Sequence, residues 1–81
     1  MKLQVIVTLK KDVLDPQGSA IKNSLSNMGF KNIESLRQGI TFEIIIKEKN
    51  EKVALSQAKD MCEKLLANLT IEDYSVKAIK E

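Results

Sequence analysis

The tetrapeptide Asp15-Pro16-Gln17-Gly18 fixes the point where an extended segment gives way to a helix. Aspartate is a preferred N-cap residue, and proline is favoured at the first helical position because its missing N–H would have no partner there. The residue before a proline avoids helical backbone angles, so a helix does not run through Asp15. The sequence therefore predicts that a helix begins at Pro16.

Hydrophobic periodicity predicts the other elements. Residues 2–9 alternate between apolar and polar, as in a strand with one face toward a core. The helix over 16–28 ends before Gly29, which is typical of a helix C-terminus. An apolar stripe at helical spacing over 54–69 predicts a second helix, and residues 74–79 alternate again as a closing strand.

The segment between the two helices is extended from Asn32, but its alternation breaks at Gln38-Gly39. A bulge within one long strand and a turn between two strands both explain the break. We therefore expect a single domain over 1–81 with an α+β fold. The order β-α-β(β)-α-β predicts a small two-layer sandwich, ferredoxin-like, with an antiparallel sheet and both helices on one face.

The chemical inventory excludes most classes of enzyme. The 81 residues include no histidine and one cysteine, so the usual general base and the common metal-ligand clusters are missing. Cys62 lies on the apolar stripe of the second helix, where we expect a buried, inert thiol. We assign no catalytic, cofactor-binding or metal-binding residue.

Charge and hydropathy exclude further classes. The net charge is +2, with acidic and basic residues interspersed, which is not typical of a nucleic-acid or membrane surface. The three aromatic residues, Phe30, Phe42 and Tyr74, are expected in the core rather than on an RNA-stacking surface. No signal-peptide pattern follows Met1, and we expect a cytoplasmic protein.

Two helices on one face leave the opposite face of the sheet uncovered. On that face we place Ile6, Ile45 and Ile79, and the run 44–46 is apolar on both faces. Strands of this kind usually have a second layer over them. We therefore predict at least a homodimer, with these three isoleucines as the candidate interface.

Four motifs follow one another along the chain. They are Val13-Leu14-Asp15-Pro16-Gln17-Gly18 with Ala20-Ile21, then Leu36-Arg37-Gln38-Gly39, then the run from Met61 to Asn68, then Ile71-Glu72-Asp73-Tyr74. In this order and spacing they resemble the PurS family, the small subunit of phosphoribosylformylglycinamidine synthase. The similarity covers essentially the whole chain, and it departs from the family at Ile40, where lysine is frequent.

The resemblance implies a subunit with no active site of its own. In that family a synthetase subunit binds ATP, magnesium and formylglycinamide ribonucleotide, a glutaminase subunit releases ammonia, and PurS joins the two. It also implies a homodimer or tetramer, no cofactor on this chain and no nucleic-acid or membrane partner. Candidate partner-interface residues are Asp15, Gln17, Gly18, Arg37 and Gly39.

Two other classes share this order of elements. One is an ACT-like regulatory domain that senses a small molecule, which isothermal titration with amino acids would reveal. The other is an adaptor for an unrelated complex, which a pull-down from cell extract would distinguish.

Overall fold

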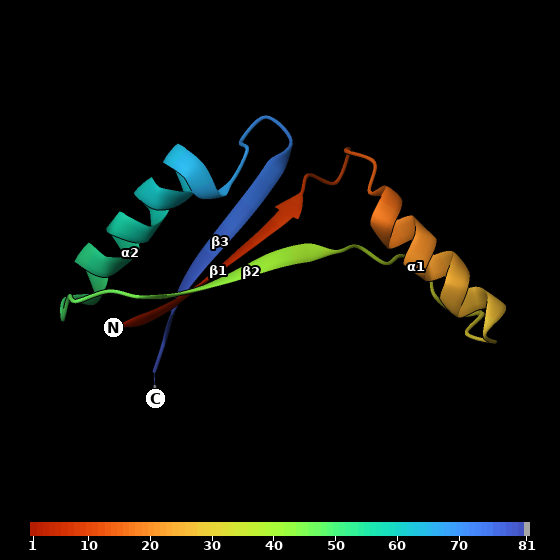
Figure 1. Cartoon of the computed structure of the whole chain (residues 1–81), viewed down its shortest axis with the longest axis horizontal. Helices are drawn as coiled ribbons and strands as arrows, with labels where there is room; N and C mark the ends of the chain where they lie inside the picture. The colour runs from red at the N-terminus through yellow and green to blue at the C-terminus, as the bar shows by residue number, and fades with distance from the viewer. Residues whose placement is uncertain (81) are drawn as a thin grey trace.

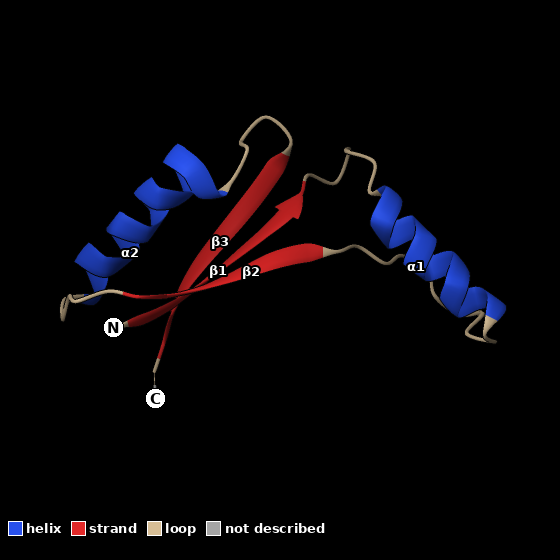
Figure 2. Cartoon of the chain, in the orientation of Figure 1, coloured by secondary structure: helices blue, strands red, loops and turns tan. Residues whose placement is uncertain are grey.

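The computed structural model describes residues 1–80 and contains one three-stranded sheet and two helices (Figures 1 and 2). The elements are β1 (Lys2–Leu9), α1 (Pro16–Asn27), β2 (Gly39–Ile45), α2 (Glu51–Met61), a π-helical turn η1 (Cys62–Leu66) and β3 (Glu72–Ile79). The strands are antiparallel in the order β2-β1-β3. The predicted α+β class and order of elements are confirmed.

The middle segment contains one strand. β2 begins at Gly39, directly after the break in alternation, and residues 32–38 run without strand pairing before it. The sequence left open a bulge or a turn between two strands as the cause of the break in alternation at Gln38-Gly39. Neither a bulge nor a second strand is present in this segment.

The core lies between β1 and α2. Leu3, Val5 and Val7 of the central strand are at most 2% exposed, because strands flank β1 on both sides and α2 covers one face. Ala54 and Ala58 are fully buried in α2, and their small side chains let the helix lie close to the sheet. Burial of each large aliphatic side chain contributes about 1.5–3 kcal/mol.

The end of the second helix differs from the predicted stripe. The Ala67 N–H donates to the Cys62 carbonyl at 2.9 Å, which closes the wider turn of a π-helix. This turn changes the helical phase, so that Cys62 is buried while Leu65 is 86% exposed. The prediction that Leu65 and Leu69 face the core was wrong, and Leu69 lies beyond the helix in the turn toward β3.

Helix α1 has the predicted ends. The Asp15 side chain caps its N-terminus, and Gly29 adopts a φ of 108° after its C-terminus. The Phe30 N–H donates to the Leu25 carbonyl, and the Gly29 N–H donates to the Ser26 carbonyl, both at 3.1 Å. These two bonds form a Schellman motif. The Phe30 side chain is nevertheless 55% exposed, so its predicted place in the core was wrong.

The position of α1 corrects the predicted arrangement of the layers. Only α2 packs on the sheet, over β1 and β3, whereas α1 lies beyond the ends of the strands as a separate arm (Figure 1). The chain measures 48 × 31 × 14 Å, and its radius of gyration is 15.9 Å. A compact chain of this length has a radius of gyration of about 12 Å. The prediction of both helices on one face was wrong because α1 is held away from the sheet at its N-terminus.

Candidate functional site

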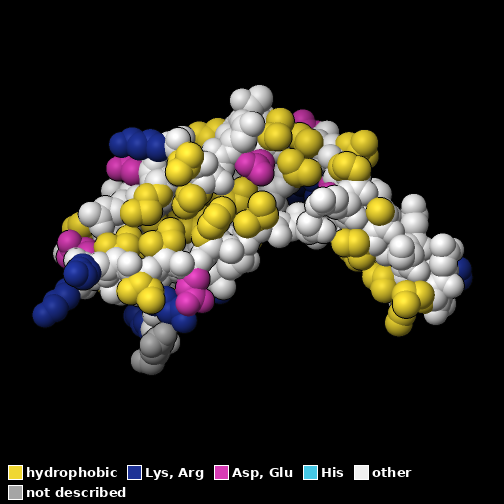
Figure 3. Space-filling model, viewed as in Figure 1, with side chains coloured by type: hydrophobic (Ala, Val, Ile, Leu, Met, Phe, Trp, Pro, Cys, Tyr) yellow, Lys and Arg dark blue, Asp and Glu magenta, His cyan; other side chains and the backbone are white. Residues whose placement is uncertain are grey.

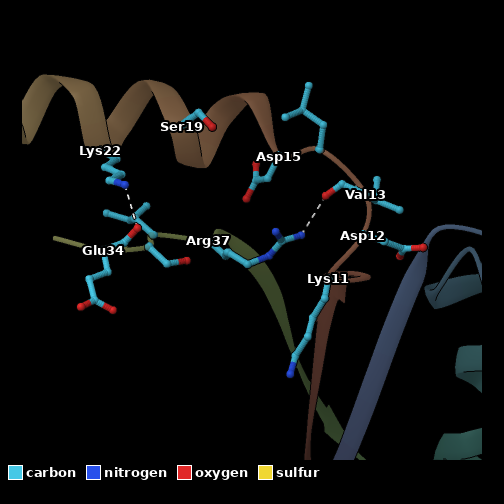
Figure 4. A pocket seen from close by; sticks show the side chains of 11 residues that line it. Lys11, Asp12, Val13, Asp15, Ser19, Lys22, Glu34 and Arg37 are labelled. Atoms are coloured by element: carbon cyan, nitrogen blue, oxygen red, sulfur yellow. Dashed lines mark hydrogen bonds between the residues drawn. The ribbon is translucent and has the colours of Figure 1, made fainter.

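The predicted partner-interface residues gather where the chain enters and leaves α1. The segment after β1 runs into the N-terminus of α1, and the segment 34–38 returns beside it to enter β2 (Figure 4). We call the residues at this crossing the junction cluster. Its members are Asp15, Gln17, Gly18, Arg37, Gln38 and Gly39.

Asp15 joins the two segments through one carboxylate. Its Oδ1 accepts a hydrogen bond from the Gly18 N–H, and its Oδ2 accepts one from the Gln38 N–H, each at 2.9 Å. The residue is only 8% exposed. The Gln38 amide, then the Gly18 amide and the charge of Arg37 lower the pKa of Asp15 from its ordinary 3.8, against the opposing effect of burial. The carboxylate therefore stays ionised at neutral pH and holds both segments.

Arg37 ties the return segment to the chain that leaves β1. Its Nη2 donates to the main-chain carbonyls of Leu9, Lys10 and Val13 at 3.4, 2.9 and 3.1 Å. Figure 4 shows the bond to Val13. The sequence placed Arg37 among the candidate partner-interface residues. In the structure its guanidinium instead closes the loop that precedes α1.

Two glycines allow the segments to approach this closely. A Cβ atom at Gly18 would lie 2.6 Å from Asp15 Oδ2 and 2.7 Å from the Leu36 carbonyl oxygen. A Cβ atom at Gly39 would lie 2.8 Å from the Thr8 side chain and 3.0 Å from the Val7 carbonyl oxygen. Both positions are therefore restricted by space rather than by backbone angle.

The junction cluster exposes a pair of side-chain amides. Gln38 Nε2 donates to Gln17 Oε1 at 2.7 Å, and both residues are exposed. Sequence reasoning missed Gln38, although its place between Arg37 and Gly39 in a motif already singled out was the available signal. Asp15 and Gly18, by contrast, are buried and offer little surface to a partner.

A polar cavity of about 370 Å³ opens beside the cluster, between α1 and the return segment. Two of the three basic side chains that line it are already engaged, because Lys22 Nζ donates to the Glu34 carbonyl at 2.7 Å (Figure 4) and Arg37 donates to three carbonyls. Within residues 1–80 no group of His, Cys, Asp or Glu side chains is placed to hold a metal ion. Nor is any helix in that range long and apolar enough to cross a membrane.

The candidate homodimer face is more polar than its isoleucines suggest. Ile45 is 77% exposed, Ile6 is 36% exposed, and Ile79 is partly buried. Strand register places Ile45 and Ile79 on either side of Lys2, which also forms an ion pair with Glu43 at 3.3 Å. The apolar surface on this face is therefore concentrated at the end that carries Ile45.

Comparison with known proteins identifies the family. Residues 2–80 match the family model PurS, described as phosphoribosylformylglycinamidine (FGAM) synthase. The chain belongs to the PurS family. The PurS subunit of Bacillus subtilis is 47% identical over 73 residues, which are 90% of this chain and 86% of that protein. The Methanocaldococcus jannaschii subunit is 39% identical over 79 residues, 98% of this chain and 95% of that protein.

Solved PurS structures share the fold. The crystal structure of Methanocaldococcus jannaschii PurS matches with a TM-score of 0.86 at 41% identity, over 94% of this chain and 92% of that one. A chain of PurLQS from Thermotoga maritima matches with a TM-score of 0.86 at 29% identity, over 94% of this chain and 93% of that one. The family therefore favours neither the ACT-like sensor nor the unrelated adaptor.

Asp15→Asn tests the role of the carboxylate in the junction cluster. The variant loses the charge that the two backbone N–H groups stabilise, so its thermal unfolding midpoint at pH 7 should fall by about 4–8 °C. The pKa of Asp15 is lower in the folded chain than in the unfolded chain. The stability that the ionised carboxylate contributes is therefore fully present at pH values above the unfolded pKa, and it is lost as the pH falls through the folded pKa.

Urea unfolding of both proteins between pH 7 and about pH 2 measures that dependence. We expect the difference in stability between wild type and variant to shrink as the pH falls below the ordinary Asp pKa of 3.8. A difference that is constant across this range would show that the ionised carboxylate is not what stabilises the junction.

Proposed function

We propose that this chain is the non-catalytic subunit that joins the synthetase and glutaminase subunits of phosphoribosylformylglycinamidine synthase. The observation that carries the proposal is the match of nearly the whole chain to a chain of the Thermotoga maritima PurLQS structure. The Methanocaldococcus jannaschii relative is likewise described as one of the subunits of formylglycinamide ribonucleotide amidotransferase in the purine biosynthetic pathway.

The reaction needs two separate sites, and neither has to lie on this chain. Glutamine hydrolysis supplies ammonia, and ATP with magnesium activates formylglycinamide ribonucleotide on the synthetase, which gives formylglycinamidine ribonucleotide. The chain has no histidine, and burial raises the pKa of the Cys62 thiol, with the charge of Glu63 acting in the same direction. Cys62 therefore stays protonated and is a poor nucleophile. We place the assembly in the cytoplasm.

The junction cluster is the surface we assign to a partner subunit. Gln17 and Gln38 are exposed and line a small pocket of about 110 Å³, where their amides can donate to and accept from a partner's main chain. Asp15, Gly18, Arg37 and Gly39 hold this surface in shape. Their role in assembly is therefore indirect, through the geometry of the two glutamines.

Co-purification with tagged synthetase and glutaminase subunits tests the proposal. Wild-type chain should be retained and should support glutamine-dependent formation of formylglycinamidine ribonucleotide, whereas the chain alone should hydrolyse no glutamine. Gln17→Ala should weaken retention with little change in melting temperature, because its hydrogen bond to Gln38 is solvent-exposed. Gln57→Ala, an exposed glutamine of α2, is the matched control.

Failure of the wild-type chain to bind either subunit would contradict the bridging role itself. Equal retention of the Gln17 and Gln57 variants would leave the bridging role intact but would remove the junction cluster from the interface.

We also propose a contact between copies of the chain through the sheet face that carries Ile6, Ile45 and Ile79. Ile45→Asp should place a charge in that contact and shift the sedimenting species toward lower mass. Val53→Asp is the control, since Val53 is an exposed apolar residue on α2. A folded Ile45 variant that sediments as wild type would exclude this face.

A further inference from the structure

The polar cavity beside the junction cluster holds hydrogen-bond donors that the chain itself does not use. The three carbonyls that Arg37 holds all bind its Nη2. A guanidinium carries five N–H groups, so those on Nε and Nη1 remain, and within residues 1–80 they have no acceptor. The Lys11 amine and the hydroxyls of Ser19 and Ser35 also line the cavity and form no hydrogen bond in the same range.

The Arg37 side chain is exposed, yet its guanidinium is held in one place. Its bonds to the Lys10 and Val13 carbonyls, at 2.9 and 3.1 Å, tie it to the segment before α1. The rotamer entropy of this long side chain is therefore lost on folding, and an incoming anion does not have to order it again. A fixed guanidinium favours a carboxylate, whose oxygens match the planar arrangement of its N–H groups.

The charges around the cavity balance in number but not in position. Three basic and three acidic residues line it. The Asp15 carboxylate is directed at two backbone N–H groups and is only 8% exposed. Figure 4 shows the carboxylates of Asp12 and Glu34 pointing away from the Arg37 guanidinium. The exposed basic groups of Arg37 and Lys11 form no ion pair in the described part of the chain, which favours an anionic ligand.

Leu14 adds an apolar contact at the edge of the cavity. It is 78% exposed, although Arg37 fixes the carbonyl of Val13 before it and the Asp15 cap fixes the chain after it. Figure 3 shows hydrophobic side chains at the surface where the sheet passes into the arm that contains α1. A free anion would leave Leu14 uncovered, whereas a protein surface covers an apolar side chain and a charged group together. The ligand that fits both features is an acidic side chain on another protein.

The cavity is continuous with the surface that carries Gln17 and Gln38. Asp15 forms part of the wall of both the polar cavity and the small pocket lined by the two glutamines. A partner subunit that contacts the glutamines therefore lies within reach of the cavity. Most residues that line the cavity are exposed, so it closes only when a larger surface covers it.

We propose that an acidic side chain of a partner subunit enters the polar cavity and pairs with Arg37 and Lys11, while an apolar residue beside it covers Leu14. The flexible stem of Lys11 lets its amine turn toward the bound carboxylate. Arg37 thus contacts the partner directly, in addition to its role in shaping the junction. The proposal rests on the bridging function proposed for this chain and adds to it the chemistry of the partner's surface.

Substitutions of Lys11 test the pairing by binding to tagged synthetase and glutaminase subunits. Lys11→Glu reverses the charge without removing a hydrogen bond of the junction cluster, so the dissociation constant of the chain for these subunits should rise about tenfold or more. Lys11→Arg keeps the charge and should bind as wild type. Lys52→Glu, at an exposed lysine of α2, is the matched control and should also bind as wild type.

Zero-length cross-linking with a carbodiimide identifies the acidic residue of the partner. The reagent activates a carboxyl group, which then forms an amide with a primary amine in contact with it. Mass spectrometry of the wild-type complex should find a peptide that joins Lys11 to an Asp or Glu of a partner subunit. Lys11→Arg should lose this peptide while keeping its affinity, because a guanidinium does not form the amide.

Leu14→Ser separates a protein partner from a free anion. It should weaken binding in the same assay with little change in melting temperature, because Leu14 is largely exposed. Circular dichroism checks that each variant is folded, and Lys11→Ala, which should also weaken binding, replaces Lys11→Glu if that variant does not fold.

Equal affinity of folded Lys11→Glu and Lys52→Glu would overturn the docking of an acidic side chain, and so would a Leu14→Ser chain that binds as wild type. In both cases the bound wild-type chain would still support the bridging function. Failure of the wild-type chain to bind either subunit would contradict the bridging function together with this contact.

Discussion

The Asp15 carboxylate is the interaction on which the rest of the structure depends. It accepts from the Gly18 N–H at the start of α1 and from the Gln38 N–H just before β2, so one side chain fixes the entry to and the exit from the helix. Arg37 completes the junction from the other side by holding three carbonyls after β1. Gly18 and Gly39 leave no room for a Cβ atom at this crossing. The direction of α1 follows from these contacts and not from packing on the sheet.

A helix held off its own sheet has consequences for the whole chain. With α1 away, only α2 covers the sheet, and the molecule is 14 Å thick along its shortest axis. The buried core is correspondingly small, with Leu3, Val5, Val7 and Cys62 as its largest fully buried side chains. Small domains are marginally stable on their own, and association supplies the missing burial. For a subunit whose proposed role is to join other proteins, a fold completed by association is consistent with that role.

Features set by local chemistry could be predicted from the sequence, whereas the packing of distant segments could not. The N-cap at Asp15, the helix end at Gly29 and the alternation of β1 each depend on neighbouring residues, and each was predicted correctly. Local signals also placed the two ends of α1, but they do not say which surface a helix packs against. The expected packing on the same sheet was therefore wrong. The wider turn at Cys62 likewise has no periodic signature, so the exposure of Leu65 was missed.

The distance between α1 and α2 within one copy tests the role of the Asp15 junction most directly. Spin labels at two exposed positions, introduced as Asn27→Cys and Gln57→Cys in a Cys62→Ala background, mark the two helices. Doubly labelled protein is diluted into an excess of unlabelled wild-type chain, so that pulsed electron paramagnetic resonance reports distances within one copy. The account predicts one narrow distance distribution for this protein and a broad one when Asp15→Asn is added. An equally narrow and unshifted distribution in the folded Asp15→Asn protein would contradict it.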